Sequence, residues 1–245
     1  MTPKDPLVDL LIHDLTGPLA IISTSTAHLL NKEEKYGPYD DSQKETLKRI
    51  QRNADKAKAL LQEMVEVYRS EERCFRKEQF LMQDVLGDAF HDAVGVVRPD
   101  IEEELSKTED RKEFSNLLRK HGIDIEISGK YCEDFFSHDR KKIRQIIRNL
   151  ISNALKYRRK TMKLCVTGDK DLIISVEDDG AGIPKEKQSY VFKRFSDVNG
   201  KEGAPEGMGF GLSCVKNLIE AMSGEIALKS VEGAGSCFTV RIPPL

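Results

Sequence analysis

The stretch NLISNALKY, residues 149–157, decides the fold because its apolar and polar residues recur at helical spacing. Asn149 and Asn153 are four residues apart, so both amides lie on one face of a helix. Buried contacts are supplied by the apolar positions of the same stretch, Leu150, Ile151, Ala154 and Leu155. The sequence therefore predicts a helix with a buried apolar side and two amides on one face.

The polar face of this helix suits a cation that carries phosphates. Asparagine carbonyl oxygens are hard ligands for a Mg²⁺ that keeps waters and substrate phosphates in its shell. Lys156 adds a point charge for phosphate, and Tyr157 adds an aromatic face. For this segment alone, two polar residues on a solvated helix face remain the alternative.

Short strand-like runs bounded by turn residues occupy much of the chain after Phe80. They cover residues 123–128, 163–168, 171–179, 224–230 and 236–242. Helical patterns cover residues 139–157 and 211–222, with an extra charged helical stretch at 99–120. This arrangement predicts an α+β two-layer sandwich, with a mixed sheet and helices on one face.

Two glycine-rich segments suit a nucleotide. In DDGAGIP, residues 178–184, Asp178 stands at a strand end, where its carboxylate can accept a hydrogen bond from an adenine amino group. The two glycines of this segment let the backbone approach a ligand, although many ordinary turns share the pattern. GMGFGLS, residues 207–213, precedes an apolar helix whose N–H groups and dipole favour phosphates. The polar residues 197–207 before it are expected to form a mobile lid.

The N-terminal part contains two long helical patterns with heptad spacing. The first follows Val8, Leu11, Leu15, Pro18, Ile22, Ser25 and Leu29, and the second follows Leu47, Ile50, Ala54, Ala57, Leu61, Met64 and Tyr68. Between them lies a turn at 35–42, in which Asp41 or Ser42 is the expected N-cap of the second helix. Residues 6–73 are thus predicted to form a helical hairpin, which has too little core to stand alone and is expected to dimerise into a four-helix bundle.

His13 falls on the first helix at a heptad position outside the seam, where another domain can reach it. Asp14 follows directly and could orient or deprotonate the imidazole so that a ring nitrogen is free to attack. Pro18 lacks an N–H, so the helix is expected to bend one turn after His13. For an isolated histidine, an ordinary surface position is the alternative.

Composition excludes several classes of protein. Lys and Arg total 39 against 41 Asp and Glu, so the net charge of −2 gives no footprint for nucleic acid. No apolar run approaches the ~20 residues needed to span a membrane, and the N-terminus does not resemble a signal peptide. The five cysteines are scattered, which indicates reduced thiols and a cytosolic setting, either for a cytoplasmic chain or for the cytosolic core of a longer membrane or soluble protein.

These segments, in this order and spacing, resemble the sensor histidine kinases of two-component signalling. The resemblance rests on the phosphoacceptor, N, first glycine, F and second glycine boxes, at residues 13–18, 149–157, 178–184, 191–195 and 207–213. It covers nearly the whole chain. It implies a dimerisation and phosphotransfer hairpin over residues 1–75, followed over 76–245 by a catalytic domain of the Bergerat (GHKL) type shared with Hsp90, gyrase and MutL.

The resemblance also implies ATP and Mg²⁺ as cofactors, with Asn153 and Asn149 at the metal and Asp178 at the adenine. Phe192 and Phe195 would anchor the lid. The implied nucleotide-binding set is Asn149, Asn153, Lys156, Tyr157, Asp178, Gly180, Gly182, Ile183, Phe192, Phe195, Gly207, Met208, Gly209, Phe210, Gly211 and Leu212.

The activity implied is that of an autophosphorylating protein-histidine kinase. The imidazole of His13 takes the γ-phosphoryl group with Asp14 as orienting base, and passes it to an aspartate of a response-regulator receiver domain. The hairpin would make a homodimer. Gly17 stands where many members carry Thr or Asn to position a hydrolytic water, so phosphatase activity is not implied.

Two other functions stay open. One is a degenerate nucleotide-binding dimeric scaffold without kinase activity. The other is an ATPase of the Hsp90, gyrase or MutL kind, which needs a general-base glutamate where Asn149 stands. The remaining histidines are expected to be structural or on the surface, with His28 kept as an outside second acceptor; they are His28, His91, His121 and His138.

Overall fold

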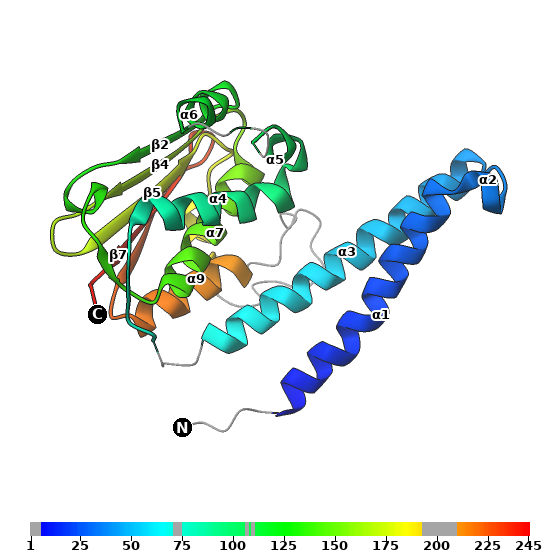
Figure 1. Cartoon of the computed structure of the whole chain (residues 1–245), viewed down its shortest axis with the longest axis horizontal. Helices are drawn as coiled ribbons and strands as arrows, with labels where there is room; N and C mark the ends of the chain where they lie inside the picture. Colours follow the sequence, from blue (N-terminus) through cyan, green and yellow to red (C-terminus); the bar gives the residue numbers. More distant parts are fainter. Residues whose placement is uncertain (1–5, 71–74, 106–107, 109–110, 193–209) are drawn as a thin grey trace. The chain divides into compact units, whose positions relative to one another are not determined.

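The chain divides into two compact units, Met1–Arg69 and Ser70–Leu245. The computed structural model describes residues 6–70, 75–105, 108, 111–192 and 210–245. The first unit is helical, whereas the second combines helices with a sheet (Figure 1).

The N-terminal unit is built from two long helices joined by a short one. They are α1 (Pro6–Asn31), α2 (Glu33–Tyr36) and α3 (Asp41–Ser70). Pro18 lies inside α1, and the helix continues through it. The proline therefore does not end the helix that carries His13.

The N-cap of α3 is Asp40, not Asp41 or Ser42 as the sequence predicted. The Gln43 backbone N–H donates to Asp40 Oδ1 at 2.8 Å, and the Asp40 N–H donates to Gln43 Oε1 at 3.0 Å. This reciprocal pair is a capping box, in which two otherwise unpaired N–H groups are satisfied. The glutamine three residues after Asp40 fixes the start of α3 one residue earlier than expected.

The buried residues of the hairpin, among those whose side chains the structure describes, are small. Thr26 and Ala54 are each 5% exposed, and Ser23 Oγ donates to Asp55 Oδ1 at 2.6 Å, which ties α1 to α3. Large apolar side chains at predicted seam positions stay exposed, namely Leu15, Ile22 and Ile50. Part of the predicted seam is therefore uncovered within one chain.

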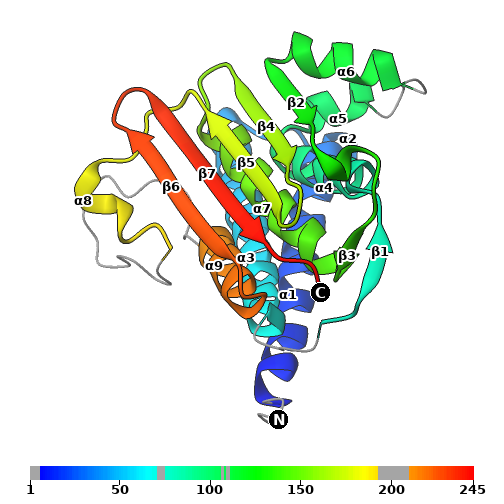
Figure 2. The same ribbon diagram turned by 90° about the vertical axis from the view of Figure 1, so that its left-hand side faces the viewer.

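The C-terminal unit is organised around a five-stranded sheet in the order β2-β4-β5-β7-β6. The strands are β2 (Ile123–Ile127), β4 (Met162–Thr167), β5 (Leu172–Asp178), β6 (Glu225–Val231) and β7 (Gly235–Ile242). β2 is parallel to β4 and the other neighbours are antiparallel, so the sheet is mixed (Figure 2). All five strands lie where the sequence predicted them.

Most of the buried helical side chains of this unit come from three helices. They are α4 (Met82–Val97), α7 (Arg140–Tyr157) and α9 (Phe210–Ala221). Leu164, Ile174 and Val240, from the three central strands, are fully buried in this core. The predicted two-layer sandwich is confirmed, but α4 was not predicted.

Smaller elements complete the unit. β1 (Glu78–Phe80) pairs antiparallel with β3 (Phe136–His138), and neither was predicted. The charged stretch 99–120 forms two helices, α5 (Pro99–Leu105) and α6 (Arg111–Lys120). The remaining elements are the 3-10 turn η1 (Lys130–Cys132) and the short helix α8 (Lys185–Gln188).

Candidate functional site

The amide of Asn149 joins α7 to the first turn of α9. Its side chain is 8% exposed, and Nδ2 donates to the Gly211 carbonyl oxygen at 3.4 Å. Arg148 Nη2 donates to Asn149 Oδ1 at 3.0 Å, so both ends of the amide are engaged. Two segments that are 62 residues apart in the sequence therefore meet at this side chain.

Asn153 lies one turn further along α7, close to the same point of α9. A β-carbon at Gly211 would lie 3.8 Å from Asn153 Nδ2 and 3.9 Å from the Asn149 side chain. Asn153 Nδ2 is buried and has no hydrogen-bond partner within the part of the chain that the structure describes. Buried amides are nearly always paired, so this one marks a place where a polar ligand fits.

The two adjacent aspartates at the end of β5 have different environments. Asp178 is 7% exposed, and its Oδ1 accepts the Gly180 backbone N–H at 2.9 Å. Burial raises the pKa of the Asp178 carboxyl above its ordinary value, against the backbone N–H donors of Gly180 and Ser236. Asp178 is thus a buried carboxylate with acceptor capacity to spare.

Asp179 faces the turn between α7 and β4 instead. Its Oδ1 accepts the backbone N–H groups of Arg159 at 2.8 Å and Lys160 at 3.0 Å. Desolvation acts upward, but the backbone donors of Lys160, Thr161 and Arg159 outweigh it and hold the pKa of Asp179 at about 2. The carboxylate of Asp179 is occupied in holding this turn.

The turn after β5 requires glycine at two positions. A β-carbon at Gly180 would overlap the Tyr157 carbonyl oxygen and lie 2.6 Å from Asp178 Oδ1. Gly182 has φ +68°, and a β-carbon there would overlap the Val231 carbonyl oxygen. The Ile183 backbone N–H donates to Ser230 Oγ at 2.8 Å, which fixes the turn against β6. The end of β5 is therefore held next to the C-terminus of α7.

Other predicted residues lie around this region. The ammonium of Lys156 lies 5.3 Å from the centroid of the exposed Tyr157 ring. The Phe192 ring meets Phe238 edge-on, with centroids 6.1 Å apart. Leu212 is buried on α9. The structure thus gathers the described members of the predicted set around α7, the first turn of α9 and the end of β5.

Several predicted residues cannot be placed in this way. Phe195, Gly207, Met208 and Gly209 lie outside the described residues. Phe210 begins α9, and His13 and Asp14 lie on α1 in the other unit, but the structure describes only the backbone of these three. Their roles stay predictions.

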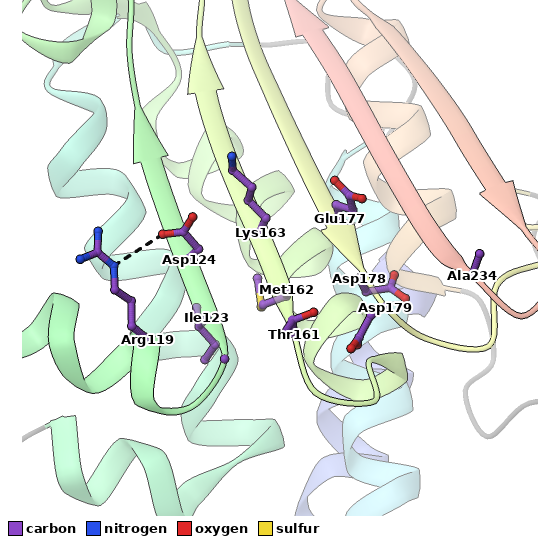
Figure 3. Close-up of a pocket in the computed structure, with 11 residues that line it drawn as sticks. Arg119, Ile123, Asp124, Thr161, Met162, Lys163, Glu177, Asp178, Asp179 and Ala234 are labelled. Carbon is purple, nitrogen blue, oxygen red and sulfur yellow. Dashed lines mark ion pairs between the residues drawn. The ribbon is translucent and has the colours of Figure 1, made fainter.

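A shallow pocket of about 410 Å³ opens where β2 and β4 begin and β5 ends (Figure 3). Its lining is Arg119, Gly122, Ile123, Asp124, Thr161, Met162, Lys163, Glu177, Asp178, Asp179 and Ala234. Apart from Asp178, it contains none of the residues predicted to bind nucleotide, and no sequence pattern predicted it. The ion pair between Arg119 and Asp124, at 3.8 Å, lies along one side.

Two kinds of feature are absent from the residues that the structure describes. None of the helices there is long and apolar enough to cross a membrane. Nor does that part of the chain contain a group of three or more His, Cys, Asp or Glu side chains placed to hold a metal ion.

The C-terminal part of the chain matches a known family of domains. Residues 138–245 match the family described as histidine kinase-, DNA gyrase B-, and HSP90-like ATPases. The match begins just before α7 and includes β4, β5, α9, β6 and β7. All the described residues of the candidate site lie within it.

Curated proteins match the chain as well. Sensor histidine kinase AtsR of Burkholderia thailandensis is 28% identical over 249 residues, which cover 98% of this chain and 37% of that protein. Adaptive-response sensory kinase SasA of Crocosphaera subtropica is 26% identical, over 98% of this chain and 59% of that protein. Sensor histidine kinase WalK of Bacillus subtilis is 39% identical over 111 residues, which cover 43% of this chain and 18% of that protein. The chain therefore spans less than two thirds of the length of these relatives.

Solved structures share the fold. Full-length ShkA in complex with AMPPNP superposes with a TM-score of 0.66 at 18% identity, over 99% of this chain and 46% of that one. The Acinetobacter baumannii histidine kinase AdeS gives a TM-score of 0.53 at 20% identity, over 95% of this chain and 98% of that one. These matches show the fold, and the resemblance to the sensor histidine kinases is confirmed by the family match and the curated relatives.

Proposed function

We propose that this chain, which is similar to sensor histidine kinases over nearly its whole length, is the catalytic core of such a kinase. It binds Mg-ATP between α7, α9 and the end of β5, phosphorylates His13, and passes the phosphoryl group to an aspartate of a response regulator. Residues 1–75 are the dimerisation and phosphotransfer domain in this proposal, and residues 76–245 are the ATP-binding domain.

The proposal rests on one observation: the side chains of Asn149 and Asn153 on α7 both lie next to Gly211 in the first turn of α9. α9 has 12 residues, and the backbone N–H groups of its first turn lack helical partners. The positive end of its dipole therefore lies beside two amides, one of which has a buried, unpartnered nitrogen. The phosphates of a nucleotide fit this arrangement, because it combines the N-terminus of a helix, the unpartnered Asn153 amide nitrogen and the exposed ammonium group of Lys156.

The same residues fit a magnesium ion that arrives with the nucleotide. Asn153 would hold it through the amide oxygen, with Asn149 nearby, because Mg²⁺ prefers oxygen ligands. When bound, the ion supplies neutralisation of the charge on the phosphates. Asn149 keeps α9 against α7 through its bond to the Gly211 carbonyl, so its removal is expected to loosen the phosphate end of the site.

Asp178 would hold the other end of the nucleotide. Its buried carboxylate is oriented by the Gly180 N–H and can accept a hydrogen bond from the adenine amino group. Gly180 and Gly182 let the turn after β5 pack closely against neighbouring backbone atoms, which side chains at these two positions would overlap. In this proposal, the closely packed turn leaves room for the base to approach Asp178. Ile183, whose backbone N–H donates to Ser230 Oγ, would line the same side of the adenine site.

Transfer then requires His13 to reach the γ-phosphorus. A neutral imidazole nitrogen attacks in line, the bond from phosphorus to the bridging oxygen breaks, and ADP leaves with that electron pair. Asp14 orients the ring and takes up its proton. The receiver aspartate attacks the phosphohistidine in a second in-line step, which restores the imidazole.

The exposed seam of the hairpin supports a homodimer. Leu15, Ile22 and Ile50 are 48%, 44% and 42% exposed, although they occupy heptad positions. A second copy of the chain would cover them in a four-helix bundle, as the heptad pattern predicts.

Labelling with γ-³²P-ATP and Mg²⁺ tests the proposal. The wild-type chain is expected to gain an acid-labile label, and His13→Gln is expected to lose the label but to keep nucleotide affinity. Asn153→Ala is expected to lose both, whereas Ser152→Ala, the neighbouring position on α7, is the matched control and keeps both. Nucleotide binding without any label in the wild type would favour the dimeric scaffold, and label on His13→Gln would move the acceptor elsewhere.

A further inference from the structure

Asp139 holds two chain segments with one carboxylate. As N-cap of α7, its Oδ1 accepts the Lys142 backbone N–H at 3.1 Å. Its Oδ2 accepts the Arg76 backbone N–H at 3.0 Å, from a residue 63 positions earlier. The side chain is 8% exposed. The segment through which the chain enters the C-terminal unit, residues 75–80, is therefore bonded to the first turn of α7.

The neighbouring His138 packs under the same segment. It is fully buried, and its ring lies parallel to Phe136 at 5.9 Å and edge-on to Phe75 at 5.6 Å. Its Nδ1 accepts the Asp139 backbone N–H at 2.8 Å, which orients the peptide that carries the capping carboxylate. Phe75, His138 and Asp139 thus form one contact between the incoming segment and α7.

The sheet of β1 and β3 extends this contact. Glu78 pairs with His138 and Phe80 with Phe136, and the Leu245 N–H donates to the Ser137 carbonyl at 2.9 Å on the other side of β3. The incoming segment is therefore held at Phe75, at Arg76 and along β1. Residues 71–74 are all that separates it in the sequence from α3.

We propose that Asp139 is a positioning residue that clasps the incoming segment to α7, so that displacement of the segment is transmitted to Asn149 and Asn153. One uninterrupted helix, Arg140–Tyr157, carries the cap at one end and both amides further along. A hydrogen-bonded helix moves as a rigid element, so a shift at its first turn displaces the amides as well. The coupling to Asn149 and Asn153 rests on the proposed function through its nucleotide and kinase readouts, whereas the clasp itself rests on the two hydrogen bonds of Asp139.

Coupling of this kind is reciprocal. If the clasp and the nucleotide both act on α7, nucleotide binding must tighten the clasp as much as the clasp favours the bound arrangement of the amides. Trypsin can report this, because Arg76 and Lys77 lie at the clasp. Bound nucleotide is therefore expected to slow cleavage after these two residues.

The substitution Asp139→Asn separates the two bonds. The amide oxygen of asparagine still caps α7, but its NH₂ group cannot accept the Arg76 N–H. In the full chain, cleavage after Arg76 and Lys77 is expected to become about fivefold faster, as for the loss of one hydrogen bond. A non-hydrolysable ATP analogue is expected to slow this cleavage in the wild type but not in the variant. Asp84→Asn, an exposed aspartate in the first turn of α4, is the matched control and behaves as wild type.

The kinase readout separates positioning from general stability. Asp139→Asn is expected to lower the autophosphorylation kcat/KM for ATP at least about fivefold, with a loss of nucleotide affinity that matches the factor by which the analogue slows wild-type cleavage. Asp139→Ser, which also keeps a cap, is expected to do the same. Unchanged cleavage in Asp139→Asn overturns the clasp. If cleavage of Asp139→Asn is faster but is still slowed by the analogue as in the wild type, the coupling is overturned. A loss of nucleotide affinity that only follows a lower Tm of the variant also overturns it. If the wild type binds the analogue but is never labelled, the kinase proposal fails while the proteolysis still decides the clasp.

Discussion

The backbone N–H of Gly180 donates to Oδ1 of Asp178 at 2.9 Å, at a position where any β-carbon would overlap the carbonyl oxygen of Tyr157. The glycine thus orients the buried carboxylate and at the same time lets the end of β5 lie against the end of α7. The adenine end of the proposed nucleotide site depends on this one pair.

Gly180→Ala is expected to weaken nucleotide binding by at least about tenfold, because the turn must move away from Tyr157 and release Asp178. Gly87→Ala on α4 is the control, since a β-carbon there meets nothing within 4 Å in the part of the chain that the structure describes. Equilibrium binding of a fluorescent ATP analogue measures both variants. Equal affinities for the two would show that the Asp178 end of the site does not contact the nucleotide.

The two adjacent aspartates are expected to separate binding from stability. Asp178→Ala should lose about 10- to 100-fold in nucleotide affinity, because a buried charged acceptor is removed. Asp179→Ala should keep most of the affinity but lower the free energy of unfolding by about 1–3 kcal/mol, because the N–H groups of Arg159 and Lys160 lose their acceptor. Isothermal titration and urea unfolding measure the two effects, and the reverse pattern would exchange the roles of the two residues.

His138 makes the C-terminal unit sensitive to acid. Burial lowers the pKa of His138 from 6.5 to about 4, with the Asp139 charge acting weakly in the other direction. Between these values the unfolded chain binds a proton that the folded chain does not, so stability is complete above pH 6.5 and falls as the pH drops towards 4. The loss is about 3 kcal/mol.

Urea unfolding followed by circular dichroism at several pH values checks this dependence. His138→Phe fills the same apolar site without a titrating group and is expected to flatten the profile between pH 6.5 and 4. The control, His91→Gln, replaces an exposed histidine of α4 and is expected to keep the acid-dependent loss. A wild-type profile that is already flat would contradict the buried, neutral state of His138.

Gly17 is expected to limit phosphatase activity. Among the described residues, nothing lies within 4 Å of a β-carbon at this position, so a side chain fits there. Gly17→Thr places a hydroxyl four residues after His13, on the same helix face, where it can position a water. Loss of label from a phosphorylated receiver domain is expected to quicken with Gly17→Thr but not with Gly17→Ala. Equal rates in all three proteins would show that this position has no part in hydrolysis.

The sheet and the helices α7 and α9 could be predicted because their patterns are long and their ends carry turn residues. The helix α4 was missed although its buried residues recur at helical spacing; they are Met82, Val85, Leu86, Ala89, Phe90, Ala93 and Val94. That spacing could have identified it, despite Gly87 and Gly95 inside the helix. β1 and β3 have three residues each, too few to show an alternating pattern.

The site was predictable in its residue types but not in its pairings. Asp178 and Asp179 are alike in the sequence. The burial of Asp178, and the bonds of Asp179 to the turn at Arg159 and Lys160, distinguish them. The second bond of Asp139 joins residues 63 positions apart, so no local pattern could reveal it. Long-range pairings of this kind depend on the assembled fold.

The most direct measurement is the site of phosphorylation after incubation of the full chain with Mg-ATP. Peptide mass spectrometry at neutral pH is expected to find one phosphoryl group per chain, on His13, lost on brief exposure to acid and absent from Asn153→Ala. A phosphoryl group on another residue, or the same amount on His13 in Asn153→Ala, would contradict the account.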